Sequence, residues 1–183
     1  MPLDDLYHYF ERYDATVFNV ATCQGQEPTE EHVAAFEQTV GFRLPDEFRA
    51  FTKSPLGGLY IEVKEELWPR PGLYAVGEFW SFLYGLKVFG MASQSIPPWL
   101  DIRKRYAAFA ESGNGDLVPF LQLVGDGDVF CFDRDGRIIA WRHDKPDARE
   151  PDDVQSFSDL LMRELHQLEG RKTRKLAMGN NNT

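Results

Sequence analysis

Cysteine is scarce in this sequence. The 183 residues include two, Cys23 and Cys131. Two cysteines so far apart form neither a disulfide framework nor a zinc site, and they are compatible with a reducing cytoplasm. Stability must therefore come from a packed core. The apolar content of 43%, with 14% aromatic residues, is sufficient for one.

Long hydrophobic runs are missing too. The longest stretch without a charge, residues 88–100, contains Gly90, Pro97 and Pro98. It is too short and too interrupted to span a bilayer. The N-terminal sequence MPLDDLYHYFERYD has neither the basic nor the apolar segment of a signal peptide. We therefore expect a soluble, cytoplasmic protein that does not act at a membrane.

Basic residues are outnumbered. There are 20 lysines and arginines against 29 acidic residues, a formal charge of −9. The segment 171–183 is basic and contains no acid, so the rest of the chain is still more acidic. Phosphate backbones repel such a body, and nucleic-acid binding is not expected. A basic protein partner would be attracted to it.

Patterns that carry catalytic chemistry are absent as well. None of the four histidines has the partners of a zinc-binding helix, and the glycines at 125 and 127 precede a predicted strand rather than a helix. Cys131 and His143 could form a nucleophile pair. A small buried hydrophobe is the more ordinary interpretation of a cysteine within VFCF. We therefore predict no catalytic residue and no cofactor.

Acids alternate with glycine at residues 125–128 and 133–136. A calcium-binding EF-hand loop beginning at Asp133 would continue to a glutamate further on, but Arg142 follows instead. Hairpin turns favour the same residue types. We interpret both segments as turns and predict no metal site. Glutamates 62, 65 and 66 are likewise interpreted as a solvated cluster and not as a catalytic pair.

The stretch FEQTVGFRLPDEFRAF, residues 36–51, predicts two short helices joined by a corner. Thr29 can cap the first helix, and Gly41 is suited to end it. Pro45 can begin the second helix, because a missing N–H costs nothing there. The phenylalanines then lie at helical spacing and form its buried stripe.

Strands are predicted where apolar runs lie between glycines and prolines, over 59–63, 72–79, 86–91, 129–132 and 137–142. Helices are predicted near the N-terminus, after Pro98, and from Ser156 to Gly170. This order indicates a single-domain α+β fold, mainly an antiparallel twisted sheet flanked by helices. The predicted parts are a helical or irregular extension (1–27), the α+β domain (28–169) and a basic, disordered tail (170–183).

Several short motifs recur in an order known from one family. The first group is Glu37, Gly41, Leu44, Pro45, Phe48, Phe51, Gly57 and Gly58; the second is Pro119, Gly127, Asp128, His143 and Asp144; the last is Ser156 and Phe157. With them, residues 28–168 resemble the SUKH superfamily, bacterial immunity proteins related to a fungal regulator of cell-wall synthesis. Leu56 stands where that family often has asparagine, and residues 64–85 exceed a minimal member.

The resemblance implies a SUKH-like fold and a non-enzymatic, intracellular protein. Such a protein neutralises a cognate toxin, often a nuclease, by direct binding. The acidic composition suits a basic toxin domain. Two alternatives remain open from the residues: a regulatory scaffold without a toxin partner, and a hydrolase that uses Glu, Asp and His side chains.

We expect the partner to contact acids and aromatics on the sheet and its adjoining loops. The candidate residues are Glu62, Glu65, Glu66 and Trp68 in the long insertion, with Asp126 and Asp128 at the hairpin tip. The alternative for each of them is a solvated loop residue, because few interface positions carry binding energy.

Overall fold

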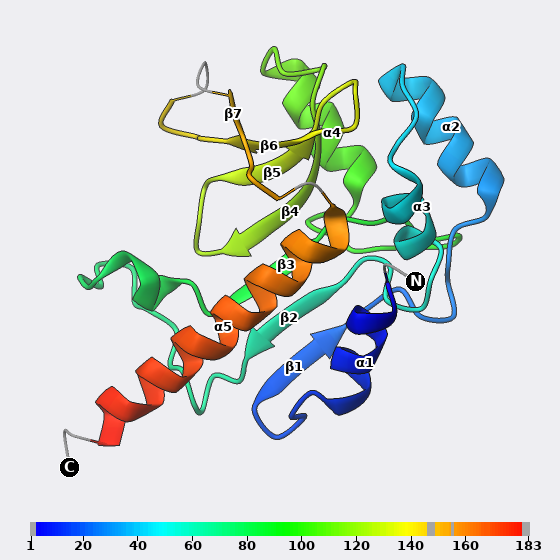
Figure 1. The fold of residues 1–183 in the computed structure, drawn as a ribbon. Coiled ribbons are helices and arrows are strands. Elements are labelled where there is room, and N and C mark those ends of the chain that lie inside the picture. Colours follow the sequence, from blue (N-terminus) through cyan, green and yellow to red (C-terminus); the bar gives the residue numbers. More distant parts are fainter. Residues whose placement is uncertain (1–2, 146–148, 155, 181–183) are drawn as a thin grey trace.

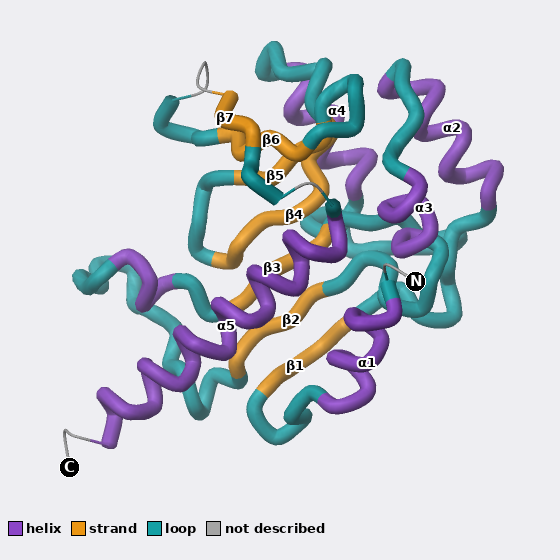
Figure 2. The backbone as a smooth tube through the Cα atoms, in the orientation of Figure 1, coloured by secondary structure: helices purple, strands orange, loops and turns teal. Residues whose placement is uncertain are grey.

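Seven antiparallel strands in chain order form one sheet in the computed structural model, which describes residues 3–145, 149–154 and 156–180 (Figures 1 and 2). The strands are β1 (Phe18–Ala21), β2 (Tyr60–Val63), β3 (Gly85–Val88), β4 (Val118–Val124), β5 (Val129–Phe132), β6 (Ile138–Trp141) and β7 (Arg149–Pro151). Each strand pairs with the next one along the chain. The predicted antiparallel α+β domain is confirmed.

Five α-helices surround this sheet: α1 (Asp4–Arg12), α2 (Glu30–Val40), α3 (Asp46–Thr52), α4 (Ile102–Glu111) and α5 (Phe157–Asn180). Helix α5 crosses one face, with α1 on the same side, and α4 lies behind the other face (Figure 1). Phe109 of α4 contacts Trp141 of β6, at 4.9 Å between ring centroids. The half of the sheet from β4 to β6 is therefore covered on both faces.

The half of the sheet from β1 to β3 has an open face. On the covered side, Ile61 and Val63 are buried beneath the helices. Their neighbours Tyr60 and Glu62 point the opposite way, as strand geometry requires, and both stay partly exposed. We call this second side the open face. Residues along β2 therefore alternate between buried and half-buried, because one side of the strand faces the helices and the other faces the open side.

The centre of the core is a group of four phenylalanines. Phe48 of α3, Phe120 of β4, Phe132 of β5 and Phe157 of α5 are all buried. The rings of Phe120 and Phe132 stack at 3.9 Å, and Phe48 contacts Phe132 and Phe157 at 5.2 Å each. This phenylalanine cluster joins the helical corner to the sheet and to α5. The predicted burial of Phe48 is confirmed.

The corner between α2 and α3 forms as predicted and is closed by a carboxylate. Thr29 accepts a hydrogen bond from the His32 backbone, and Gly41 ends α2 in the left-handed conformation. Glu37 Oε1 accepts a bond of 2.8 Å from the Leu44 backbone N–H beyond the corner. Its other oxygen pairs with Arg49, a buried arginine on α3. The glutamate of the family motif is therefore a structural residue.

The strand predicted over residues 72–79 is wrong. The segment is a loop with a turn at 72–75, and it leads into the short 3-10 helix η1 (Phe79–Phe82). Its apolar side chains Leu73, Tyr74 and Val76 face solvent. Alternating apolar residues indicate a strand only where a neighbouring strand is present to pair with them.

The end predicted for the last helix at Gly170 is also wrong. Ser156 caps α5 by accepting a bond from the Asp159 N–H, but the helix continues to Asn180. Arg171 donates to the Leu83 carbonyl at 3.1 Å, so the segment expected to be disordered packs on the body. Residues 181–183 lie outside the described part. No helix within the described residues is long and apolar enough to cross a membrane.

We expect Glu37→Gln to lower the free energy of unfolding by about 1–3 kcal/mol, because it weakens the Leu44 contact and removes one charge partner of the buried Arg49. Chemical denaturation of the two proteins measures this. Glu31→Gln, at an exposed position on the same helix, is the control and should change stability little. Equal stability of wild type and Glu37→Gln would show that the carboxylate does not hold the corner.

Candidate protein-binding surface

Every second connection between neighbouring strands lies at the same edge of the sheet. Residues 64–84 leave β2 and enter β3, residues 125–128 join β4 to β5, and residues 142–145 follow β6. In an antiparallel meander these connections share an edge, which we call the loop edge. A side chain at Gly125 would collide with the Phe82 carbonyl, so the first two segments touch. The predicted residues Glu65, Glu66, Asp126 and Asp128 therefore lie in connections that share this edge.

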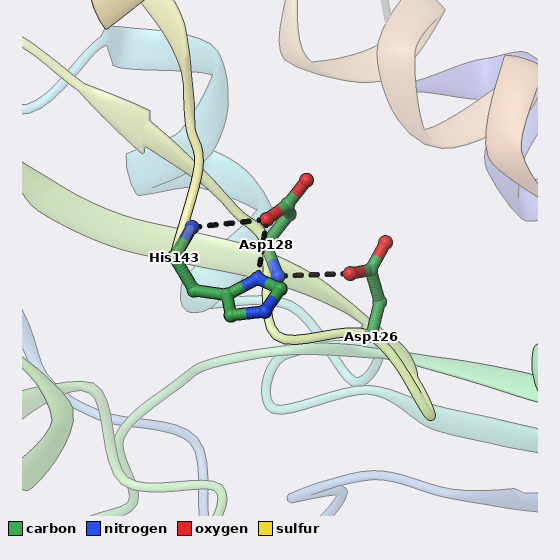
Figure 3. Close-up of side chains that lie close together, drawn as sticks. All are labelled: Asp126, Asp128 and His143. Atoms are coloured by element: carbon green, nitrogen blue, oxygen red, sulfur yellow. Dashed lines mark hydrogen bonds and ion pairs between the residues drawn. The ribbon is translucent and has the colours of Figure 1, made fainter. Parts of the chain in front are cut away.

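Asp128 closes the β4–β5 hairpin against the end of β6 (Figure 3). One carboxylate oxygen accepts from the His143 backbone N–H at 3.0 Å and lies 2.8 Å from His143 Nδ1. The other oxygen accepts from Arg142 at 2.8 Å. Asp126 in turn accepts a bond of 3.0 Å from the Asp128 backbone N–H. These contacts make a latch between two segments of the loop edge.

Gly127 completes the latch by leaving room for the histidine. A methyl group at that position would lie 2.7 Å from atoms of the His143 ring. Any other residue would displace the ring from Asp128. The family motif residues Gly127, Asp128 and His143 thus form one structural unit, although they are separated along the chain.

The contacts within the latch shift the pKa values of His143 and Asp128. The hydrogen bond to Asp128 raises the pKa of His143 above its ordinary value of 6.5. Partial burial tends to raise the pKa of the Asp128 carboxyl. Bonds from His143 and Arg142 outweigh this effect, and the net pKa is lowered. Ligand atoms of Asp126, Asp128 and His143 lie within 4.8 Å of one another. Both Asp128 oxygens already accept from protein donors, so the arrangement serves best as a latch.

A cavity of about 250 Å³ lies between the sheet and α5, beside the latch. Titratable groups line it, which is the geometry a hydrolase would need. Its Arg163 pairs with both Asp152 and Glu164, however. Such paired carboxylates are typical of a structural network, whereas a catalytic acid and base need freedom to exchange protons. The Cys131–His143 pair does not form, because Cys131 is buried in β5 and burial raises its thiol pKa.

The insertion residues have different environments. Glu62, on the open face, pairs with Arg70 at 2.9 Å and accepts from the Tyr60 hydroxyl at 2.7 Å. Glu65 and Glu66 are exposed in the turn that follows β2. Trp68 is 1% exposed, and its indole N–H donates to the Ser81 carbonyl at 3.1 Å. The prediction of Trp68 as an exposed anchor is therefore wrong, because residues brought back by the loop cover it.

The most exposed apolar side chains of the described residues were not among the predicted contacts. Leu73, Tyr74 and Val76 are 91%, 89% and 100% exposed, and Phe79 is 61% exposed. We call residues 71–79 the apolar loop. It projects from the body between β2 and β3 (Figure 1). The prolines at 69 and 71 were the signal that a loop, and not a strand, begins here.

The base of the apolar loop is held firmly. Trp80 contacts Trp68, with 6.3 Å between ring centroids. The Arg174 guanidinium of α5 lies 4.1 Å from the Trp80 ring centroid and pairs with Glu78 at 2.7 Å. The end of α5 therefore supports the loop. The arrangement presents exposed apolar groups from an ordered base.

The sheet and its helices form a single-domain α+β protein. The latch and the apolar loop give it a surface suited to binding. The chain belongs to the SMI1/KNR4 family (SUKH-1), whose model matches residues 27–163. Neither a curated protein nor a solved structure matches the chain significantly. Proteins of this family are generally non-catalytic, and membership is consistent with an immunity-type or regulatory role.

We expect Asp128→Asn to lower the pKa of His143 toward its ordinary value, because the charged acceptor is lost. The raised pKa means that protonated His143 stabilises the fold below about pH 6.5, and that this contribution disappears as the pH rises through the folded-state value. NMR titration of the imidazole measures the change. Asp135→Asn, in the other hairpin turn, should leave it unaltered. An unchanged His143 pKa in Asp128→Asn would contradict the latch.

Proposed function

We propose that this chain is an immunity-type protein that binds and neutralises a cognate toxin in the cytoplasm, and that the apolar loop makes the principal contact. The observation that carries the proposal is the exposure of Leu73, Tyr74, Val76 and Phe79 on one projecting segment. Contiguous exposed apolar groups mark interaction sites in soluble proteins. Family membership and its generally non-catalytic character support the same function.

The loop has the energetic features of a binding element. Fully burying a side chain such as Leu73 or Val76 contributes about 1.5–3 kcal/mol. Tyr74 adds an aromatic group of a type enriched among residues that dominate interfaces. The contacts of Trp80 and Arg174 order the base beforehand, which reduces the entropy lost on binding.

Charge at the loop edge plays a secondary part. The charges of Glu62 and Asp128 are matched by Arg70 and Arg142, which leaves little attraction for a partner. Glu65 and Glu66 are exposed, and no ion pair to them is found within the described residues. With the net charge of −9, they would accelerate encounter with a basic toxin domain such as a nuclease. We therefore assign them to the rim of the interface.

The triple variant Leu73→Ser, Tyr74→Ser, Val76→Ser should abolish protection while the protein stays folded, because these side chains make no core contact. Protection is measured by co-expression with each toxin gene found next to this one, and affinity by calorimetry, where we expect a loss of at least about 100-fold. Met178→Ser, at a further exposed apolar position, is the control.

Each outcome of that experiment has a separate meaning. If wild type protects against no neighbouring toxin and captures housekeeping proteins instead, the immunity assignment is wrong and the regulatory alternative is favoured. If wild type protects and the triple variant protects equally well, the function stands and the assignment of the apolar loop is wrong.

Glu65→Lys with Glu66→Lys should slow association with the toxin by about tenfold at low salt, because steering by exposed charges is lost. Dissociation should change little, since rim charges act mainly on the encounter. Stopped-flow kinetics at about 20 mM and at about 500 mM salt, where the Debye length is roughly 20 Å and roughly 4 Å, would separate these effects. Equal association rates at low salt would remove both glutamates from the rim.

A further inference from the structure

Two cations lie side by side where α4 meets the open face. Lys87 is on β3, opposite Tyr60 of β2 and Gln122 of β4. Arg105 is on α4. The Lys87 ammonium lies 5.4 Å, and the Arg105 guanidinium 5.7 Å, from the centroid of the same Phe89 ring. Both positive charges therefore lie around one ring, close enough for the charge of Arg105 to act on Lys87.

Neither cation has an acidic partner among the described residues, although the chain contains 29 acids. The buried Arg49 and the partly buried Arg163 are paired with carboxylates. Arg105 Nε is buried and has no hydrogen-bond acceptor among the described residues. Groups of this kind are normally satisfied, because an unpaired buried donor costs free energy. An oxyanion is the kind of group that would satisfy this donor and both charges.

Burial without a counter-charge disfavours the protonated form of both cations. Burial lowers the pKa of Lys87, and the charge of Arg105 lowers that pKa further. Burial also lowers the pKa of Arg105. A bound carboxylate would reverse both effects, since an opposite charge favours the protonated form. The Arg105 guanidinium can hold such a group with two parallel hydrogen bonds, and Lys87 can add a third.

An aromatic surface adjoins the cations. Trp99 is 50% exposed and contacts the Tyr60 ring edge-on, with 5.1 Å between centroids. The Lys87 ammonium lies 5.9 Å from the Trp99 ring centroid. Tyr60 is held in place by its hydrogen bond to Glu62. Exposed tryptophan beside paired cations offers apolar contact and charge within one patch.

We propose that this cation–aromatic patch, formed by Lys87, Arg105, Trp99 and Tyr60, binds an acidic segment of a protein partner. A carboxylate of the segment accepts from Arg105 and Lys87, and an adjacent apolar side chain rests on Trp99. Charge complementarity selects this occupant, because two cations without an acidic partner among the described residues attract a carboxylate locally, although the net charge of the chain is −9. The proposal goes beyond toxin binding by the apolar loop and does not depend on it.

A fluorescein-labelled peptide of alternating glutamate and leucine tests the proposal with the full-length protein. Anisotropy at 50 mM salt should show binding, and Lys87→Gln or Arg105→Gln should each weaken it by about tenfold, as expected for loss of a charge-assisted contact. Lys104→Gln, an exposed lysine next to Arg105 on the same helix, is the matched control and should alter affinity less than about twofold. Trp99→Ala should weaken binding without changing net charge.

Four results would overturn the proposal. The first is no binding to wild type, and the second is equal binding of a peptide with glutamine in place of glutamate. The third is full competition by inorganic phosphate at millimolar concentration, which would indicate a simple anion site. The fourth is concentration-dependent self-association, seen by sedimentation and lost in Lys87→Gln and Arg105→Gln, which would assign the patch to a second copy of this chain. Thermal melts establish that each variant is folded.

Discussion

Because the seven strands follow chain order, every second connection returns to the same edge of the sheet. This constraint determines at which edge of the sheet each helix and each long loop lies. The connections that carry α2, α3 and α4 share the opposite edge, where they contribute to the core. The loop edge is left with the hairpin turn at 125–128, the segment after β6 and the long insertion at 64–84. The latch and the apolar loop thus lie at the same edge, and the connections there contain no α-helix within the described residues.

The two halves of the sheet have different physical roles. Between β4 and β6, α3 and α5 bury the phenylalanine cluster on one face and α4 covers the other face, so this part supplies the cohesion of the fold. Between β1 and β3, one face is left open, and its side chains satisfy one another by the Tyr60–Glu62–Arg70 contacts. Lys87 and Arg105 stand at the junction between the part covered by α4 and the open face, and neither cation is paired with a carboxylate of the described residues.

Local patterns in the sequence were enough to predict the corner, the hairpins and the apolar face of α5. Caps, turns and helical spacing are determined within a few residues. Strands β1, β4 and β7 are not among the predicted strands. Strands β1 and β7 are short and exist only through pairing with distant neighbours, whereas the apolar run of β4 was used only to place the turn at 125–128. The burial of Trp68 depends on Ser81 and Trp80 folding back over it. The adjacency of Lys87 and Arg105 likewise comes from tertiary packing. Of the predicted contact residues, the hairpin acids could be grouped from the meander alone, whereas the apolar loop was mistaken for a strand.

In the apolar loop, the residues that hold the loop in place differ from the residues that are exposed to solvent. Its base is held by Trp68, Trp80 and Arg174, whereas the side chains of Leu73, Tyr74 and Val76 touch solvent alone. Substitutions at the tip therefore leave the folded state nearly unaffected, and their thermodynamic effect is confined to whatever the tip meets. A lineage of such proteins could exchange these few residues repeatedly as its partner diverges, with the scaffold unchanged. The same separation makes the tip a natural position for selecting new specificities by directed evolution.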